Sequence, residues 1–168
     1  MKSVHILHSD RCSLTVVTQS DIPVLHQILE DSETKRFLPE LCNEFQISDS
    51  LQHSLNHSTN TYLKTKAFCG GIRINDTLIG FIALMDITTN PTLFYAIHPS
   101  YRNNGYMKEC IIATIRFVNE AKLCQIIQSE VYCDNVISAR LLTNLNFKIY
   151  KQSGNKDYYV IYLDETYL

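Results

Sequence analysis

The sequence predicts one α/β domain over residues 1–168, in which a mixed, twisted sheet of about seven strands is flanked by helices. Two observations support this class. Residues 67–85 have the pattern of two strands joined by Asn75-Asp76, a dipeptide suited to a tight hairpin turn. Residues 93–131 then alternate strand, helix and strand, which favours a parallel crossover within the same sheet. The length fits one domain, and no repeat or clear linker interrupts the chain.

The N-terminal part is expected to hold a strand followed by helices. The expected elements are a strand at residues 11–17 and helices at residues 22–29, 33–38 and 48–57. Ser20 and Asp21 precede the first helix, where their side-chain oxygens can accept hydrogen bonds from free backbone N–H groups. Pro39 is expected to end the second helix, because a proline ring cannot continue one.

The C-terminal half shows clearer periodicity. Strands are expected at residues 93–97, 125–131 and 158–163, and helices at residues 105–121 and 135–145. In the first of these helices the apolar residues from Met107 to Ala121 lie on one stripe. This spacing indicates a helix that packs one face against a sheet. The chain is expected to close with a helix followed by two strands.

Composition and charge argue against several classes of protein. A formal net charge of −2 gives no electrostatic reason to expect nucleic-acid binding. No run approaches the roughly 20 apolar residues of a membrane helix, and the first ten residues lack the apolar core of a signal peptide. The six cysteines include no C-x-x-C pair, so neither a zinc site nor a disulfide framework is predicted. We therefore expect a cytoplasmic protein with no metal site and no nucleic-acid or membrane partner.

Residues 97–107 are the most informative segment. They leave an apolar strand, pass through a polar loop and begin the amphipathic helix. The first turn of a helix offers free N–H groups and the positive end of the helix dipole, which together favour a phosphate. Gly105 lets the backbone approach an anion without a Cβ atom in the way, and Arg102 adds a permanent positive charge. The alternative is a plain strand-to-helix connection whose polar residues face water.

The run Arg102-Asn103-Asn104-Gly105-Tyr106-Met107 resembles R/Q-x-x-G-x-G/A, the acetyl-CoA signature of the GNAT superfamily. Residues 99–109 also resemble the P-e-y-W-G-k-G-y-x-x-E run of its RimJ/RimL-like branch. In that comparison Arg102 replaces the tryptophan, Asn103 replaces the glycine, and Glu109 is retained. Met107 stands where the broader signature has a small residue.

The resemblance continues along the chain in the order of that branch. Asp10-Arg11 with Ser20-Asp21 is similar to its opening, residues 33–39 to its p-e-v-x-r-y-l-p helix, and residues 78–82 to its l-i-G-f-i strand. Asn135-Val136-Ile137-Ser138 matches N-x-x-S, and Leu142-x-x-Leu145-Asn146-Phe147 matches L-x-x-L-G-F. Asn146 replaces the family glycine at a helix end, where a left-handed residue is favoured and asparagine is the next best choice.

The resemblance implies a GNAT fold and an N-acetyltransferase that moves an acetyl group from acetyl-CoA to a primary amine by direct attack. The acceptor would be a protein α-amine or a small-molecule amine, and the chain would be a monomer or a homodimer. The implied acetyl-CoA-binding residues are Ile97, His98, Arg102, Asn103, Asn104, Gly105, Tyr106, Met107, Asn135 and Ser138. The family opens its sheet at the end of residues 95–98, where backbone N–H groups can polarise the thioester carbonyl.

Ser138 is the residue that the resemblance places beside the thioester sulfur. There it would protonate or hydrogen-bond the leaving thiolate, while Asn135 would hold the pantetheine arm. Many members of the superfamily carry a tyrosine four residues after this serine, but this chain has Leu142. From spacing alone, Asn135 is equally well explained as a helix N-cap with Ser138 as its third-position partner.

An acceptor ammonium must lose a proton before it can attack, so a base or a chain of waters is needed. Glu130-Val131-x-x-x-Asn135 is similar to the E-V-x-x-x-N spacing of related N-terminal acetyltransferases, which makes Glu130 the candidate base. Asp157, before the final strand, and His98, at the end of the opened strand, are alternatives. A solvent-facing carboxylate with no catalytic role is the simpler explanation of Glu130.

Two other functions stay open at this stage. One is a family member that binds CoA or acyl-CoA without turnover, as a sensor or scaffold, because the tryptophan and glycine positions of the loop are altered. The other is a nucleotide-binding regulatory domain that uses the same helix terminus, since phosphate sites recur with unrelated chemistry.

Overall fold

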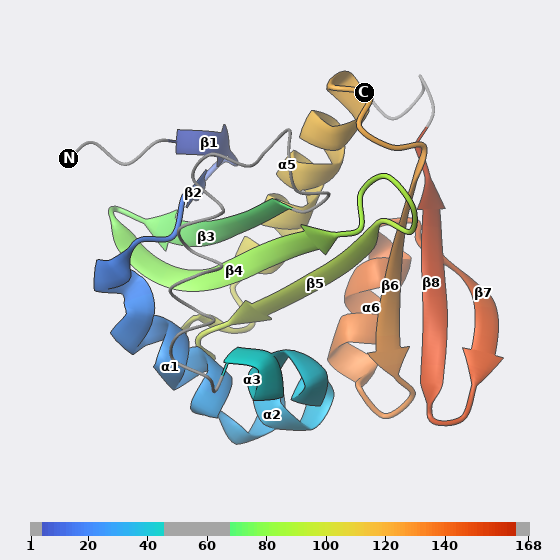
Figure 1. Cartoon of the computed structure of the whole chain (residues 1–168), viewed down its shortest axis with the longest axis horizontal. Helices are drawn as coiled ribbons and strands as arrows, with labels where there is room; N and C mark the ends of the chain where they lie inside the picture. The colour runs from blue at the N-terminus through green and yellow to red at the C-terminus, as the bar shows by residue number, and fades with distance from the viewer. Residues whose placement is uncertain (1–4, 46–67, 164–168) are drawn as a thin grey trace.

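The computed structural model describes residues 5–45 and 68–163, which form one eight-stranded mixed sheet with helices on both faces (Figure 1). The strands are β1 (His5–His8), β2 (Ser13–Thr15), β3 (Phe68–Ile74), β4 (Thr77–Met85), β5 (Thr92–Ile97), β6 (Ile126–Tyr132), β7 (Lys148–Ser153) and β8 (Lys156–Tyr162). Their order across the sheet is β1-β2-β3-β4-β5-β6-β8-β7. The predicted class is confirmed, with eight strands where the sequence indicates about seven.

Helices cover the two faces of this sheet. They are α1 (Ile22–Glu30), α2 (Ser32–Phe37), α3 (Pro39–Phe45), α5 (Tyr106–Glu120) and α6 (Val136–Asn144). Helices α1 to α3 lie on one face and α5 and α6 on the other (Figure 1). Within the described ranges, no helix has both the length and the apolar character needed to cross a membrane.

The central hairpin and the crossover follow the prediction. Strands β3 and β4 pair antiparallel around Asn75 and Asp76, whose φ angles of 46° and 68° are those of a left-handed turn. The antiparallel meander continues into β5, and β5 then pairs parallel with β6 after the chain has passed through α5. Asn146 has a φ of 66°, the left-handed conformation expected where α6 ends.

The N-terminal part differs from the prediction in two places. The expected strand at residues 11–17 is shorter, at Ser13–Thr15, and is preceded by β1, which the sequence did not indicate. Pro39 follows α2 as expected, but it also opens α3. Proline is tolerated in the first turn of a helix, where its missing N–H would have no intrahelical acceptor. The helix expected at residues 48–57 lies outside the described residues.

The start of α1 is held by Asp21, although not as the predicted Ser20-Asp21 cap. Thr18 is the N-cap of a short 3₁₀ turn. Its backbone N–H (2.7 Å) and its hydroxyl (2.9 Å) both donate hydrogen bonds to the Asp21 carboxylate. The buried guanidinium of Arg73 on β3 donates to the same carboxylate. Burial raises the pKa of Asp21, but the hydrogen bonds from Arg73 and Thr18 outweigh it, and the pKa lies below its ordinary value.

Apolar residues fill both faces of the sheet, so the central strands are buried on two sides. Helices α5 and α6 pack residues such as Ile111 and Leu142 on one face, and α1 packs Ile28 on the other. Strand β4 is buried from Leu78 to Leu84, which explains why its sequence is a nearly continuous apolar run. Burial of this kind is the main favourable term in folding.

Strands β5 and β6 separate soon after they meet, and this separation positions the site. Their parallel pairing is confined to Thr92 and Gln128. One further bond, from the Ser129 hydroxyl to the Leu93 carbonyl oxygen (3.1 Å), joins the two strands just beyond that pair. In the described part of the sheet, the rest of β5 pairs with β4 alone. The gap therefore opens along the second half of β5, toward the loop that leads into α5.

Candidate active site

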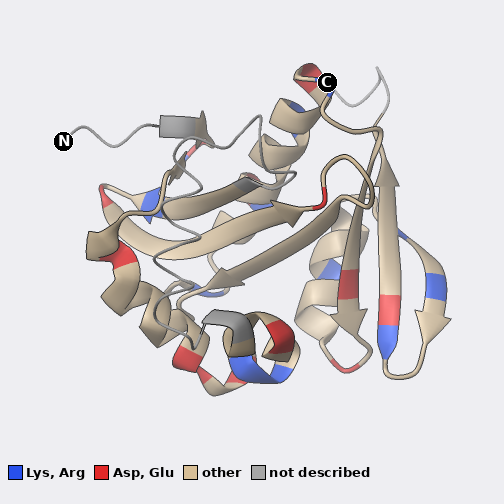
Figure 2. Ribbon diagram, in the orientation of Figure 1, with Lys and Arg blue, Asp and Glu red and all other residues tan. Residues whose placement is uncertain are grey.

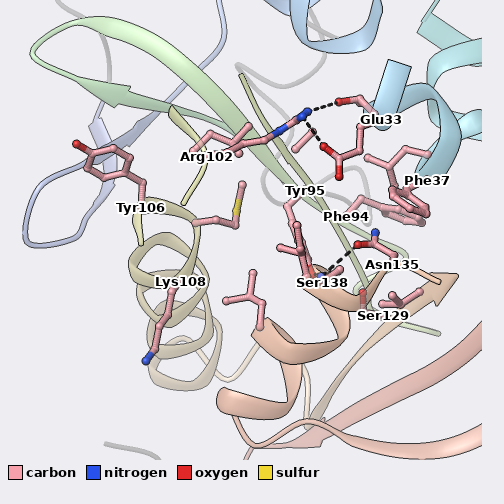
Figure 3. A pocket seen from close by; sticks show the side chains of 18 of the residues that line it. Glu33, Phe37, Phe94, Tyr95, Arg102, Tyr106, Lys108, Ser129, Asn135 and Ser138 are labelled. Atoms are coloured by element: carbon pink, nitrogen blue, oxygen red, sulfur yellow. Dashed lines mark hydrogen bonds and ion pairs between the residues drawn. The ribbon is translucent and has the colours of Figure 1, made fainter. Parts of the chain in front are cut away.

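A cavity of about 330 Å³ lies in the gap between β5 and β6. Its walls come from α2, β5, the loop before α5, the first turn of α5, β6 and α6 (Figure 3). Its lining residues include Glu33, Phe37, Tyr95, Arg102, Gly105, Glu130, Asn135 and Ser138. Segments that are far apart in the sequence thus meet where the sheet is split, a common place for a ligand in an open α/β sheet.

The predicted phosphate turn has the geometry expected of an anion site. Gly105 is the N-cap of α5 with a φ of 82°, and no side chain caps the first turn of this helix. Asn103 before it is also left-handed, with a φ of 61°. The turn is braced by the Asn104 side-chain amide, which donates to the Arg102 carbonyl oxygen (2.8 Å). The first N–H groups of α5 are therefore available to a phosphate.

Arg102 points away from this helix terminus and toward α2 (Figure 3). Its guanidinium donates to the carboxylates of Asp31 and Glu33, each at 2.5 Å. Burial raises the pKa of Asp31, but the hydrogen bonds from Arg102 and from Thr34 bring it below its ordinary value. The carboxylates of Asp31 and Glu33 thus neutralise the Arg102 guanidinium, which was predicted to bind the phosphates. Through these bonds Arg102 connects the loop before α5 to the start of α2.

Arg11 is the guanidinium that lies against the turn, and sequence reasoning missed it. Its Nη2 atom donates to the Asn104 carbonyl oxygen and its Nε atom to Glu109, both at 2.7 Å. A Cβ atom built on Gly105 would lie 3.2 Å from the same Nη2 atom. Hydrogen bonding from Arg11 lowers the pKa of Glu109 below its ordinary value. Both residues belong to matched family motifs, but nothing in the spacing of those motifs indicates that they touch.

Asn135 and Ser138 form the start of α6. The Asn135 side-chain oxygen accepts a hydrogen bond from the Ser138 backbone N–H (3.2 Å), so the N-cap interpretation of the pair is confirmed. The cap also holds the Ser138 side chain at the cavity wall. There its hydroxyl oxygen lies 2.5 Å from the hydroxyl oxygen of Tyr95 on β5. Tyr95 was not predicted as a site residue, and Leu142, at the usual tyrosine position, is fully buried in the core.

The three candidate bases occupy different surroundings. Glu130 lines the cavity, and its carboxylate accepts a hydrogen bond from the Lys156 ammonium (3.3 Å). Asp157 accepts from the Gln152 side-chain amide (2.6 Å), and the His98 Nδ1 atom accepts from the Ser100 backbone N–H (3.2 Å). Neither Asp157 nor His98 is among the described residues that line the cavity. Of the three, Glu130 is the one that the fold brings to the opening between β5 and β6.

The structure brings most of the predicted site residues into this one cavity. The predicted residues that line it are Ile97, Arg102, Asn103, Asn104, Gly105, Tyr106, Met107, Glu130, Asn135 and Ser138. His98 instead forms the N-cap of the 3₁₀ turn Pro99–Tyr101 and contacts the Tyr101 ring edge-on at 6.0 Å between centroids.

Residues 11–148 match the family model of the acetyltransferase (GNAT) domain. The chain belongs to the GNAT acetyltransferase family. The matched region includes the turn before α5, the gap between β5 and β6 and the start of α6. The chain is therefore an acetyl-CoA-dependent acetyltransferase by family, and the cavity is the candidate site for that co-substrate.

Solved GNAT structures share the fold over nearly their whole length. A RimL ribosomal L7/L12 α-N-protein acetyltransferase in complex with coenzyme A is similar with a TM-score of 0.78 and 13% identity, over 93% of this chain and 96% of that one. The microcin C7 self-immunity acetyltransferase MccE, in complex with acetyl-CoA and AMP, gives a TM-score of 0.72 and 13% identity, over 91% and 93% of the two chains. No curated protein sequence matches the chain.

A third structure, a ribosomal-protein-serine acetyltransferase homologue from Vibrio cholerae, gives a TM-score of 0.73 at 17% identity, over 96% of this chain and 99% of that one. At these identities the likeness shows the fold.

Proposed function

We propose that this GNAT enzyme transfers the acetyl group of acetyl-CoA to a primary amine, and that a polypeptide α-amine is its preferred acceptor. The observation that carries the proposal is the single cavity that joins the uncapped start of α5, the Ser138 hydroxyl and the Glu130 carboxylate. The start of α5 suits the phosphates, the Ser138 hydroxyl suits the thioester sulfur, and the Glu130 carboxylate suits the amine. The structural likeness to RimL enzymes supports a peptide acceptor.

The lining of the cavity supports direct attack of the amine on the thioester. Among the described residues that line it there is no cysteine and no histidine. An acetyl-enzyme intermediate needs an activated nucleophile, and the Ser138 hydroxyl contacts the Tyr95 phenol rather than a base. Both substrates must then be bound at once, with the reacting atoms held close together in a ternary complex.

Each part of the cavity has a role in this proposal. The first N–H groups of α5, around Gly105, hold the pyrophosphate, and Asn135 orients the pantetheine arm. Backbone N–H groups of β5 that lack a partner on β6 polarise the carbonyl as negative charge develops on its oxygen. The Ser138 hydroxyl donates a hydrogen bond to the sulfur as the thiolate leaves.

Glu130 is the proposed base that removes the proton from the acceptor ammonium. We expect Glu130→Gln to lower the rate most at neutral pH and least at high pH, where the amine is already neutral. Asp157→Asn is the matched control, because that carboxylate does not line the cavity, and its pH–rate profile should stay that of the wild type. A wild-type profile for Glu130→Gln would show that its carboxylate is structural and would leave a chain of waters as the route for the proton.

The acceptor class is tested by thiol release from acetyl-CoA with a panel of amines. Peptides with a free α-amine should react fastest, and the same peptides with a blocked α-amine should not react. Polyamines, free amino acids and aminoacyl nucleotides complete the panel. A clear preference for one of these small amines would contradict the peptide assignment while leaving amine acetylation in place.

A further inference from the structure

Two hydroxyl groups meet inside the cavity, one from each of two elements that form its walls. The Tyr95 phenol on β5 and the Ser138 hydroxyl on α6 lie 2.5 Å apart (Figure 3). The Ser138 backbone is fixed by the Asn135 cap, so the serine side chain is held at the first turn of its helix. A contact this short between two elements indicates a directed hydrogen bond.

Either hydroxyl can donate in this contact, and the phenol, the more acidic of the two, is the better donor. Burial raises the pKa of Tyr95 to about 12, so the phenol keeps its proton at neutral pH. Within the described residues Ser138 is the acceptor that its O–H reaches. A serine hydroxyl can accept one hydrogen bond while donating its own proton elsewhere. With Tyr95 as donor, the Ser138 proton is free to point into the cavity.

We propose that Tyr95 is a positioning residue for Ser138: it donates to the serine oxygen and so directs the serine O–H at the thioester sulfur. This inference rests on the proposed function, because it concerns the leaving group of the same transfer. Many GNAT members carry a tyrosine at the α6 position that is Leu142 here. In this chain the tyrosine hydroxyl beside Ser138 comes from β5.

The bonds and protons exchanged in acetyl transfer explain why Tyr95 orients the Ser138 hydroxyl and does not itself give up a proton. The amine lone pair forms the new C–N bond, the C–S bond breaks with its electron pair going to sulfur, and the amine proton leaves through the base. A thiol ordinarily has a pKa near 8.5, far below the value of Tyr95, so transfer of the phenol proton to the thiolate is unfavourable. Tyr95 therefore keeps its proton throughout, and Ser138 stabilises sulfur by a hydrogen bond.

The kinetic test is a double-mutant cycle on acetyl transfer. Tyr95→Phe keeps the ring and removes the hydroxyl, and should lower kcat about tenfold with little change in the KM for acetyl-CoA, as expected for a transition-state interaction. In the Ser138→Ala background the same change should have almost no further effect. Tyr162→Phe, which removes a phenol hydroxyl from an exposed position on β8 outside the cavity lining, should keep the wild-type kcat.

A second measurement needs no acceptor. The ultraviolet absorbance of the thiolate gives the pKa of the CoA thiol bound to each variant. Tyr95→Phe should raise that pKa by about one unit, the equivalent of the tenfold effect on kcat, and should leave it unchanged when Ser138 is already alanine.

Two results would overturn the inference: a bound thiol whose pKa is the same in wild type and Tyr95→Phe, or equal losses in both serine backgrounds. If the thiol shift is present but no amine is acetylated, the proposed function fails and the inference stands.

Discussion

Gly105→Val is expected to abolish detectable binding of CoA. The valine places branched carbons where the pyrophosphate approaches the first N–H groups of α5. At a CoA concentration of about 100 times Kd the wild type should gain about 2.7 kcal/mol, a rise in Tm of roughly 5–10 °C for a chain of this size. The variant should show none of this rise, and a thermal-shift titration with CoA measures it.

The control for this substitution must separate backbone strain from loss of the ligand. Gly105 has a φ of 82°, so a β-branched residue there costs about 1–3 kcal/mol by strain alone. Gly154 in the β7–β8 turn has a φ of 62° and open space around it, away from the cavity. Gly154→Val should lose similar stability but keep the full rise in Tm with CoA. A full rise in Gly105→Val would mean that the turn is only a connection.

Ser138→Ala is expected to lower kcat about a hundredfold, the usual scale for the loss of a hydrogen-bond donor to a developing negative charge. The hydroxyl matters most as charge develops on sulfur, so the KM for acetyl-CoA should change little. Steady-state kinetics with the best acceptor measure both values. The Asn135 cap uses the backbone N–H of Ser138 and not its hydroxyl, so α6 should keep its start in the variant.

Thr143→Ala is the matched control for Ser138→Ala. It also removes a hydroxyl from α6, but from an exposed residue whose hydroxyl donates to the Ala139 carbonyl oxygen (2.8 Å). Its kcat should equal that of the wild type. If Ser138→Ala also keeps the wild-type kcat, the serine takes no part in stabilising the leaving thiolate.

Local signals in the sequence predicted the elements that form the site. The Asn75-Asp76 turn, the apolar stripe of α5 and Gly105 each act through their own neighbours, so spacing and residue type were sufficient. The same holds for Asn146, whose φ of 66° follows from its position at a helix end. The structure therefore confirms the hairpin and the crossover helix, and it places Gly105 at the start of that helix.

Tertiary partners could not be predicted in this way. Arg102 was assigned to phosphate from its motif, yet its guanidinium is bound by Asp31 and Glu33, about 70 positions earlier. Arg11 lies over the turn from a loop near the N-terminus. The spacing of charged residues on a short helix does not predict which loop will contact them. In Figure 2 acidic and basic residues lie close together on α2, whose Glu33 is one of the two carboxylates that bind Arg102.

The hydroxyl of Tyr95 was missed for a similar reason. A tyrosine in a central strand is most often part of the core, and its ring does pack against the core of the α5 face. Its function becomes visible when the fold brings Ser138, 43 residues later, to its hydroxyl. At Pro39 the end of α2 was predicted correctly, but the start of α3 at the same residue was not predicted.

The central claim is direct transfer of an acetyl group from acetyl-CoA to an amine within one cavity. Initial rates with both substrates varied, on the best peptide acceptor of the panel, test it most directly. Direct attack in a ternary complex predicts double-reciprocal lines that intersect, together with a product peptide heavier by one acetyl group on its α-amine. Parallel lines, with acetyl retained on the protein in the absence of acceptor, would mean a covalent intermediate and contradict the account.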